Sequence, residues 1–126
     1  MTVPFGDPLR QYNAMQPEID AAASNFFRSG SYMLGLHVQA FEREWARAVG
    51  GAHGVGVGNG TDALLLALRA AGVGPGDEVI TVPNAAGYTA FALRIIGACP
   101  VYADVDPQRW TLDPADVVHR ITPRTK

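Results

Sequence analysis

The sequence predicts an α/β fold with a mainly parallel sheet and flanking helices, and three observations indicate it. From Gly50 onward, short segments with strand character alternate with apolar segments that have helical spacing. Glycines mark where these elements end. The 126-residue chain also has 48% apolar residues, which suffices for the core of one domain. A repeated order of strand, helix and strand is typical of parallel sheets with right-handed crossovers.

Two helices are predicted before this region. In the first, apolar residues recur at helical spacing: Met15, Ile19, Ala22, Ala23 and Phe26. Pro17 is expected near its first turn and Gly30 at its end. The second helix is predicted over residues 38–49, with one apolar stripe formed by Val38, Phe41, Trp45 and Ala48. Trp45 is therefore expected to belong to the core.

The alternating region predicts further strands and helices in turn. The strands are predicted over residues 53–57, 79–82 and 100–105. The helices are predicted over residues 61–71, through residues 91–96 as far as Gly97, and from an N-cap and proline at Asp113 and Pro114. Residues 61–71 are apolar nearly all round, so this helix is expected to be buried. Open sheets commonly have about five or six strands, so this sheet is expected to be incomplete.

Composition excludes several classes of function. The net charge is -2 without a basic cluster, so no nucleic-acid partner is expected. The apolar runs are far shorter than the roughly 20 residues that span a bilayer, and the N-terminus has no signal-peptide pattern. A cytoplasmic protein without membrane contact is therefore expected, and the single cysteine, Cys99, excludes an internal disulfide. His37, His53 and His119 lack partners at ligand spacing, so no metal site is expected.

A glycine-rich turn at residues 54–63 is the most informative stretch, because it leads from a predicted strand into a helix. The N–H groups of Thr61, Asp62 and Ala63 can hold a phosphate there, since the first amides of a helix lack internal partners. The Thr61 hydroxyl adds a donor, whereas the Asp62 carboxylate must point away from a dianion or pair with another group. The spacing leaves open the alternative that Thr61 or Asn59 simply caps the helix.

A dinucleotide-binding site is the rival interpretation of this turn. Gly58, Gly60 and Ala63 match the alanine-ended form of the dinucleotide fingerprint, and Glu78 follows at about the 20-residue distance of the ribose-binding acid. In that fold, however, the acid lies at the far end of the second strand, whereas Glu78 precedes the strand at residues 79–82. The order of the elements therefore counts against a nicotinamide or flavin site.

Several segments occur together in one order along the chain. They are Gly58-Asn59-Gly60-Thr61-Asp62-Ala63-Leu64, Gly74-Pro75-Gly76-Asp77-Glu78-Val79-Ile80-Thr81, residues 101–106 and Ile121-Thr122-Pro123-Arg124-Thr125-Lys126. From about Gly30 to Lys126, the chain resembles the DegT/DnrJ/StrS family of sugar aminotransferases. The resemblance implies the N-terminal part of the large domain of a type I PLP-dependent transferase. Residues 1–36 would form an extended segment and helix, and residues 37–126 an incomplete PLP-binding large domain.

The resemblance also implies a cofactor and a reaction. Members use pyridoxal 5'-phosphate (PLP), usually as homodimers, to move an amino group, typically from glutamate, to a nucleotide-linked keto-sugar in amino-sugar biosynthesis. By this analogy Gly60, Thr61 and Asp62 hold the cofactor phosphate. Members typically place an aromatic ring against the pyridine, and here that position is Ala86. Tyr88 either stacks in its place, or packs at the start of the next helix or contacts substrate.

Two further polar residues carry open alternatives. Asn84 follows a predicted strand, where it either meets a polar group of the cofactor or substrate or serves only as a turn residue. Trp110 precedes the cap at Asp113, and packing within its loop is favoured over stacking on a ligand.

PLP chemistry needs a lysine for the Schiff base and a carboxylate on the pyridinium nitrogen. Lys126 is the only lysine, and the resemblance places it before the catalytic lysine, which is expected beyond residue 126. The 126-residue chain alone is therefore expected to be inactive. Two alternatives stay open: a PLP-dependent sugar dehydratase of the same family, in which histidine replaces the lysine, and a non-catalytic remnant that binds phosphate.

Overall fold

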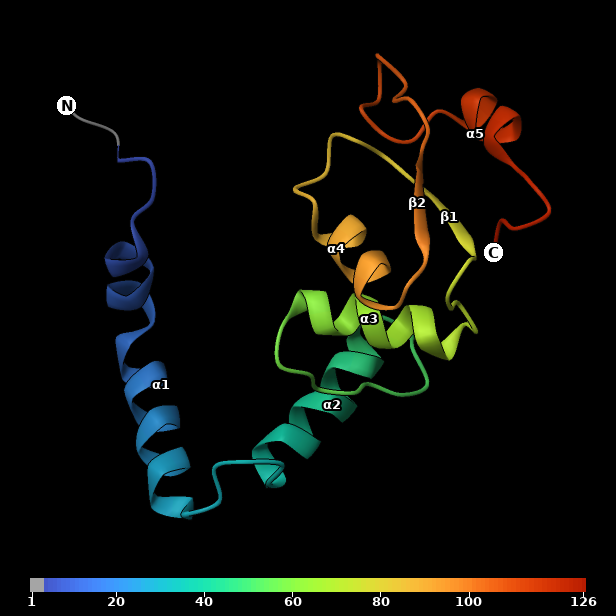
Figure 1. Cartoon of the computed structure of the whole chain (residues 1–126). Coiled ribbons are helices and arrows are strands. Elements are labelled where there is room, and N and C mark those ends of the chain that lie inside the picture. The colour runs from blue at the N-terminus through green and yellow to red at the C-terminus, as the bar shows by residue number, and fades with distance from the viewer. Residues whose placement is uncertain (1–3) are drawn as a thin grey trace. The chain divides into compact units, whose positions relative to one another are not determined.

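Two helices, α1 (Pro8–Ser29) and α2 (Leu36–Ala48), dominate the first of the chain's two units, which ends at Gly56 (Figure 1). The computed structural model describes residues 4–126. Helix α1 begins at Pro8 because the Asp7 carboxylate accepts the Arg10 N–H at 3.0 Å. Pro17 therefore lies inside the helix and not in its first turn, which corrects the prediction. Gly30 ends the helix as predicted, with a φ of 65°.

The apolar stripe of α2 is present but largely uncovered. Trp45 is 57% exposed, and its ring stacks on that of Phe41 with centroids 5.9 Å apart. Within this helix the buried residue is Ala46. Within residues 4–126, the prediction that Trp45 belongs to the core is therefore wrong. Periodicity identifies the apolar face of a helix, but it does not show whether another element packs on that face.

The strand predicted over residues 53–57 is not formed. Within residues 4–126, this segment takes part neither in the two-stranded sheet nor in an isolated bridge. The N–H of Gly56 donates instead to the Glu42 carboxylate of α2 at 2.7 Å. A strand depends on a neighbour that satisfies its backbone groups, and residues 4–126 supply none here.

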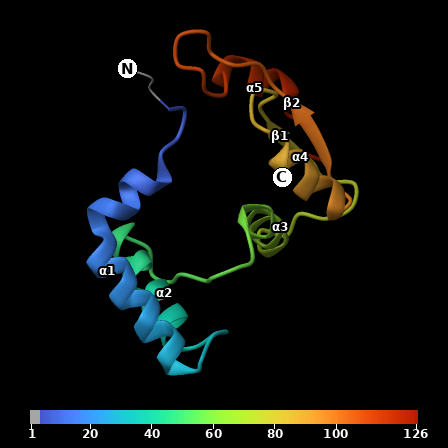
Figure 2. The ribbon, with the colours of Figure 1, turned by 90° about the vertical axis from the view of Figure 1, so that its left-hand side faces the viewer.

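The second unit, Val57–Lys126, has the predicted alternation of helices and strands. Its elements are α3 (Gly60–Ala70), β1 (Glu78–Thr81), α4 (Tyr88–Ile95), β2 (Cys99–Tyr102) and α5 (Pro114–Arg120). The two strands are parallel, with Glu78 opposite Cys99 and Thr81 opposite Tyr102. Helix α4 makes the crossover between them and packs on both strands and on α3 (Figure 2). The predicted parallel α/β arrangement is thus confirmed.

The core of this unit lies where α4 meets α3 and the strands. Its buried residues are Val73, Leu93, Ile96 and Ala98, with Leu65, Leu68 and Val79 packed around them. Leu93 is completely buried. Helix α3 has no fully buried residue, and Leu66 on its outer face is 50% exposed. The prediction that α3 is buried on all sides is wrong within the described residues, because one of its faces packs on α4 and the other faces solvent.

The buried carboxylate of Glu78 ties the end of the described chain to β1. Glu78 is 6% exposed, and it accepts hydrogen bonds from the Thr122 hydroxyl at 2.5 Å and from Arg124 Nε at 2.9 Å. Thr125 bridges to Glu78 in parallel, and the Lys126 N–H donates to the Glu78 carbonyl at 2.9 Å. The hydrogen bond from the Thr122 hydroxyl, followed by that from Arg124, lowers the pKa of the Glu78 carboxyl.

Candidate functional site

The start of α3 carries a reciprocal pair of side chains. The Asn59 side-chain oxygen accepts the Asp62 N–H at 2.9 Å, and the Asn59 amide nitrogen donates to the Asp62 carboxylate, also at 2.9 Å. Asn59 is therefore the N-cap, which was one of the two alternatives. The Asp62 carboxylate pairs with Asn59, as expected if its charge must be kept away from a bound anion.

The free backbone donors at the start of α3 differ from the predicted set of Thr61, Asp62 and Ala63. The Ala63 N–H donates to the Asn59 carbonyl at 3.0 Å, and the Asp62 N–H is taken by the Asn59 side chain. The N–H groups of Gly60 and Thr61 donate to no protein acceptor within residues 4–126. The unpaired donors at the positive end of the helix dipole are thus those of Gly60 and Thr61.

An open hollow of about 400 Å³ lies beside these donors. It is lined by Asn59, Gly60, Thr61, Leu64 and Tyr88. Helix α4 begins at Tyr88 and packs against α3, which brings the two helix starts together. Tyr88 is 60% exposed, so most of its ring is accessible. The structure thus gathers Gly60, Thr61 and Tyr88 around one hollow, whereas Asp62 and Ala86 do not line it.

The segment between β1 and α4 contains Gly87, which turns the chain into the helix, and the polar residue Asn84. Gly87 precedes α4 with a φ of 73°, a left-handed conformation that glycine adopts readily. Asn84 lies three positions before it and donates its side-chain amide to the Trp110 carbonyl at 3.2 Å. Trp110 itself is 72% exposed and has a φ of 58°. The prediction that the Trp110 ring packs within its loop is therefore wrong. The Asn84 amide has a hydrogen-bond partner within the protein.

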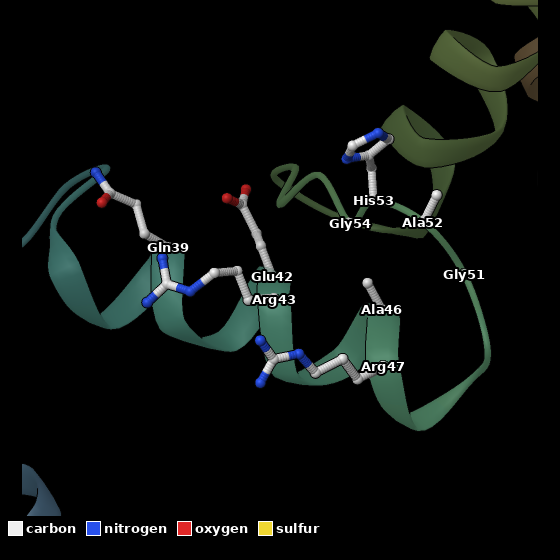
Figure 3. A pocket seen from close by; sticks show the side chains of 9 residues that line it. All are labelled: Gln39, Glu42, Arg43, Ala46, Arg47, Gly51, Ala52, His53 and Gly54. Atoms are coloured by element: carbon white, nitrogen blue, oxygen red, sulfur yellow. The ribbon is translucent and has the colours of Figure 1, made fainter.

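A different hollow, of about 340 Å³, lies within the first unit between α2 and residues 51–54. Figure 3 shows that Arg43 and Arg47 extend along α2, whereas the His53 ring points away from their guanidinium groups. The Glu42 carboxylate at this hollow is engaged by the Gly56 N–H. These charged groups do not converge on one point, and the arrangement offers no obvious acid–base pair.

Metal centres and membrane-spanning helices are two other kinds of feature that a chain of this size could carry. Residues 4–126 contain no group of three or more histidine, cysteine, aspartate or glutamate side chains placed to hold a metal ion. None of the helices in that range is both long enough and apolar enough to cross a membrane. The hollow at the start of α3 combines free backbone donors with an aromatic ring and is taken as the candidate site.

Comparison with known proteins identifies the family of this chain. Residues 13–126 match the model of the DegT/DnrJ/EryC1/StrS aminotransferase family. The chain is 45% identical over 126 residues to the dTDP-3-amino-3,4,6-trideoxy-alpha-D-glucose transaminase of Micromonospora megalomicea subsp. nigra, covering 100% of this chain and 34% of that protein. The resemblance predicted from the sequence is confirmed.

Solved structures agree with the sequence match. DesV of S. venezuelae, solved in complex with a ketimine intermediate, aligns with a TM-score of 0.95 and 43% identity over 98% of this chain and 33% of that one. NtdA of Bacillus subtilis, solved with bound cofactor PMP, aligns with a TM-score of 0.92 and 31% identity over 99% of this chain and 29% of that one. The chain thus spans about a third of the length of the curated relative and of each structure.

Proposed function

Because the chain belongs to the DegT/DnrJ/EryC1/StrS aminotransferase family, we propose that the intact protein is a PLP-dependent aminotransferase acting on a nucleotide-linked keto-sugar in amino-sugar biosynthesis. Glutamate is the proposed amino donor, and the proposed protein is a cytoplasmic homodimer. Residues 37–126 would belong to its PLP-binding large domain and residues 1–36 to the segment before it. The observation that carries the proposal is the pair of free amides at the family's glycine-rich turn, beside the ring of Tyr88.

The start of α3 fits the phosphate end of the cofactor. The free amides of Gly60 and Thr61 point from the first turn of an 11-residue helix, where backbone donors and helix dipole both favour an anion. A Cβ at Gly60 would meet no atom within 4 Å, so open space adjoins these donors. We assign Gly60 and Thr61 to the phosphate, and Asp62 to holding the cap geometry through Asn59.

The start of α4 fits the ring of the cofactor. Tyr88 lines the same hollow as Thr61. Ala86, at the position where family members typically present a ring, has no ring of its own. We assign Tyr88 to contact with the cofactor ring or the substrate, and Ala86 to the short segment that leads to Tyr88. PLP supplies the electron sink for amino transfer. The residues of this chain bind and orient it, and the Schiff-base lysine is assigned outside residues 1–126, which are expected to be inactive alone.

The dinucleotide alternative loses its ribose-binding acid. Glu78 is 6% exposed, and its carboxylate is already occupied by Thr122 and Arg124. Turning it toward a ribose would break the hydrogen bonds that it accepts from Thr122 and Arg124 in its buried position. The burial of Glu78 therefore supports the aminotransferase proposal over a nicotinamide or flavin site.

Titration of the intact protein with PLP tests the proposal. Thr61→Val removes the hydroxyl donor and keeps the side-chain volume nearly the same. PLP affinity is expected to fall about 3- to 10-fold, which is the effect of losing one hydrogen bond. Gly60→Ala adds a methyl group to open space and is expected to weaken PLP binding while the melting temperature holds. Leu66→Ala, on the outer face of the same helix, is the matched control and should leave affinity unchanged. A protein that takes up no PLP, or that binds NADH instead, contradicts the proposal.

A further inference from the structure

The segments that follow β1 and β2 are joined by one side-chain hydrogen bond. The Asn84 amide donates to the Trp110 carbonyl at 3.2 Å, across 26 positions of sequence. Asn84 lies between β1 and α4, and Trp110 lies between β2 and α5. Since the strands are parallel, both segments leave the same, carboxyl edge of the sheet, where ligands of open α/β folds are commonly bound.

The conformation of Trp110 aims its carbonyl without burying its ring. Its φ of 58° lies in the left-handed region, which is unusual for a bulky side chain. The turn is held by Asp106, whose carbonyl accepts the Trp110 N–H at 2.8 Å and whose carboxylate accepts the N–H groups of Gln108 and Arg109 at 2.7 and 3.0 Å. The ring is 72% exposed, so packing does not compensate for the unusual backbone. What this conformation yields is a carbonyl directed at Asn84.

The segment that carries the Asn84 donor has few other hydrogen bonds. Residues 83–86 are exposed, and a hollow of about 210 Å³ separates part of the segment from Thr81 and Tyr102 at the ends of the strands. Its other described hydrogen bond is local, from the Gly87 N–H to the Ala85 carbonyl at 2.7 Å. Within residues 4–126, the Asn84 amide is thus the hydrogen bond that links residues 83–86 to another segment.

We infer that Asn84 is a positioning residue for the cofactor site: by tying residues 83–87 to Trp110, it fixes where α4 begins and so holds Tyr88 at the hollow beside Thr61. This inference rests on the proposed function, because it assigns a purpose to the placement of Tyr88. Asn84 does not line the hollow and acts only through the segment that carries Tyr88.

The test compares three variants of the intact protein by amide hydrogen exchange and by PLP titration. Asn84→Asp keeps the shape but replaces the donor with an acceptor, Asn84→Gln keeps an amide donor, and Trp110→Gly keeps the carbonyl in a backbone that glycine adopts readily. Asn84→Asp is expected to speed exchange across residues 85–90 and to weaken PLP binding, each by about 3- to 10-fold. In Asn84→Gln, the exchange rate and the PLP affinity should both lie between those of Asn84→Asp and the wild type. In Trp110→Gly, both quantities should stay near the wild-type values.

The two readouts separate this inference from the proposed function. If the wild-type protein takes up no PLP, the proposed function fails, while hydrogen exchange still decides whether Asn84 holds the segment. Unchanged exchange across residues 85–90 in Asn84→Asp overturns the inference. Equally faster exchange across core residues 92–98 also overturns it, because the bond would then stabilise the whole unit and not the position of Tyr88.

Discussion

Glu78 and Arg124, 46 positions apart, form an ion pair in which the carboxylate is buried and the guanidinium is exposed. The Thr122 hydroxyl donates to the other carboxylate oxygen, so both oxygens of Glu78 are satisfied. The pair holds residues 122–126 beside the start of β1, where Thr125 continues the parallel pairing. A buried carboxylate with these partners makes the stability of this region sensitive to pH.

We predict that Glu78→Gln flattens the loss of stability at acid pH. The pKa of Glu78 is lowered in the folded protein, so its stabilising effect is complete above the unfolded value of about 4.3 and disappears as the pH falls through the lower folded value. The variant should be less stable than the wild type at neutral pH, and the difference should shrink toward acid. Urea midpoints measured across this range test the prediction. Glu18→Gln, at an exposed position of α1, serves as the control. If the stability of Glu78→Gln depended on pH in the same way as that of the wild type, the prediction would be contradicted.

We predict that Asn59→Ala destabilises the protein by about 1 kcal/mol, because it removes the N-cap of α3. It also releases the Asp62 carboxylate from its partner, so PLP affinity should fall together with stability. Asn13→Ala makes the same substitution inside α1, where alanine favours the helix and a gain of up to about 0.7 kcal/mol is expected. Chemical denaturation of the two variants tests the prediction. If both variants changed the unfolding free energy in the same direction, the result would argue against a capping role for Asn59.

We predict that Leu93→Ala costs about 2–5 kcal/mol of unfolding free energy, because Leu93 is completely buried between α4 and its neighbours. Leu66→Ala deletes the same atoms from the exposed face of α3 and should change stability by no more than about 0.5 kcal/mol. Denaturant midpoints of both variants provide the measurement. A small effect at Leu93 would mean that the core lies elsewhere in the intact protein.

We predict that Gly54→Ala destabilises the first unit by about 1–3 kcal/mol. A Cβ at Gly54 would lie 2.6 Å from the Glu42 carbonyl oxygen, so the backbone of α2 or of residues 51–56 must move. Gly74→Ala is the matched control, because a Cβ there meets nothing within 4 Å and the backbone has no positive φ. Thermal melting of the two variants, with exchange at the Gly56 amide as a local probe, tests the close approach.

Local signals in the sequence predicted the elements of the second unit well. Asp113 followed by proline predicted the start of α5, and the Asp113 carboxylate does accept the Ala115 N–H at 2.9 Å. Gly30 and Gly97 adopt the left-handed conformations expected of glycines that end helices. Each of these features depends on a few adjacent residues, which is why the sequence reveals them.

Features that depend on distant partners could not be predicted. The strand at residues 53–57 needs a neighbour, and the burial of Trp45 needs a covering element, neither of which a periodic pattern reveals. The bond from Asn84 to Trp110 joins two unremarkable loop positions, and only the structure brings them together. At the site, the glycine-rich turn at residues 54–63 was predicted from the sequence. Which amides stay free depends on the hydrogen bonds that the Asn59 side chain makes with Asp62.

The parallel pairing of β1 with β2 through α4 has a consequence for the order in which the second unit folds. The crossover between Glu78 and Cys99 is shorter than the loop between Glu78 and Arg124, so closing it costs less chain entropy. The contact of Glu78 with Arg124 closes a longer loop, across 46 positions. Local contacts favour rapid formation. We therefore expect β1, α4 and β2 to assemble early around Leu93, and residues 122–126 to join the sheet afterwards.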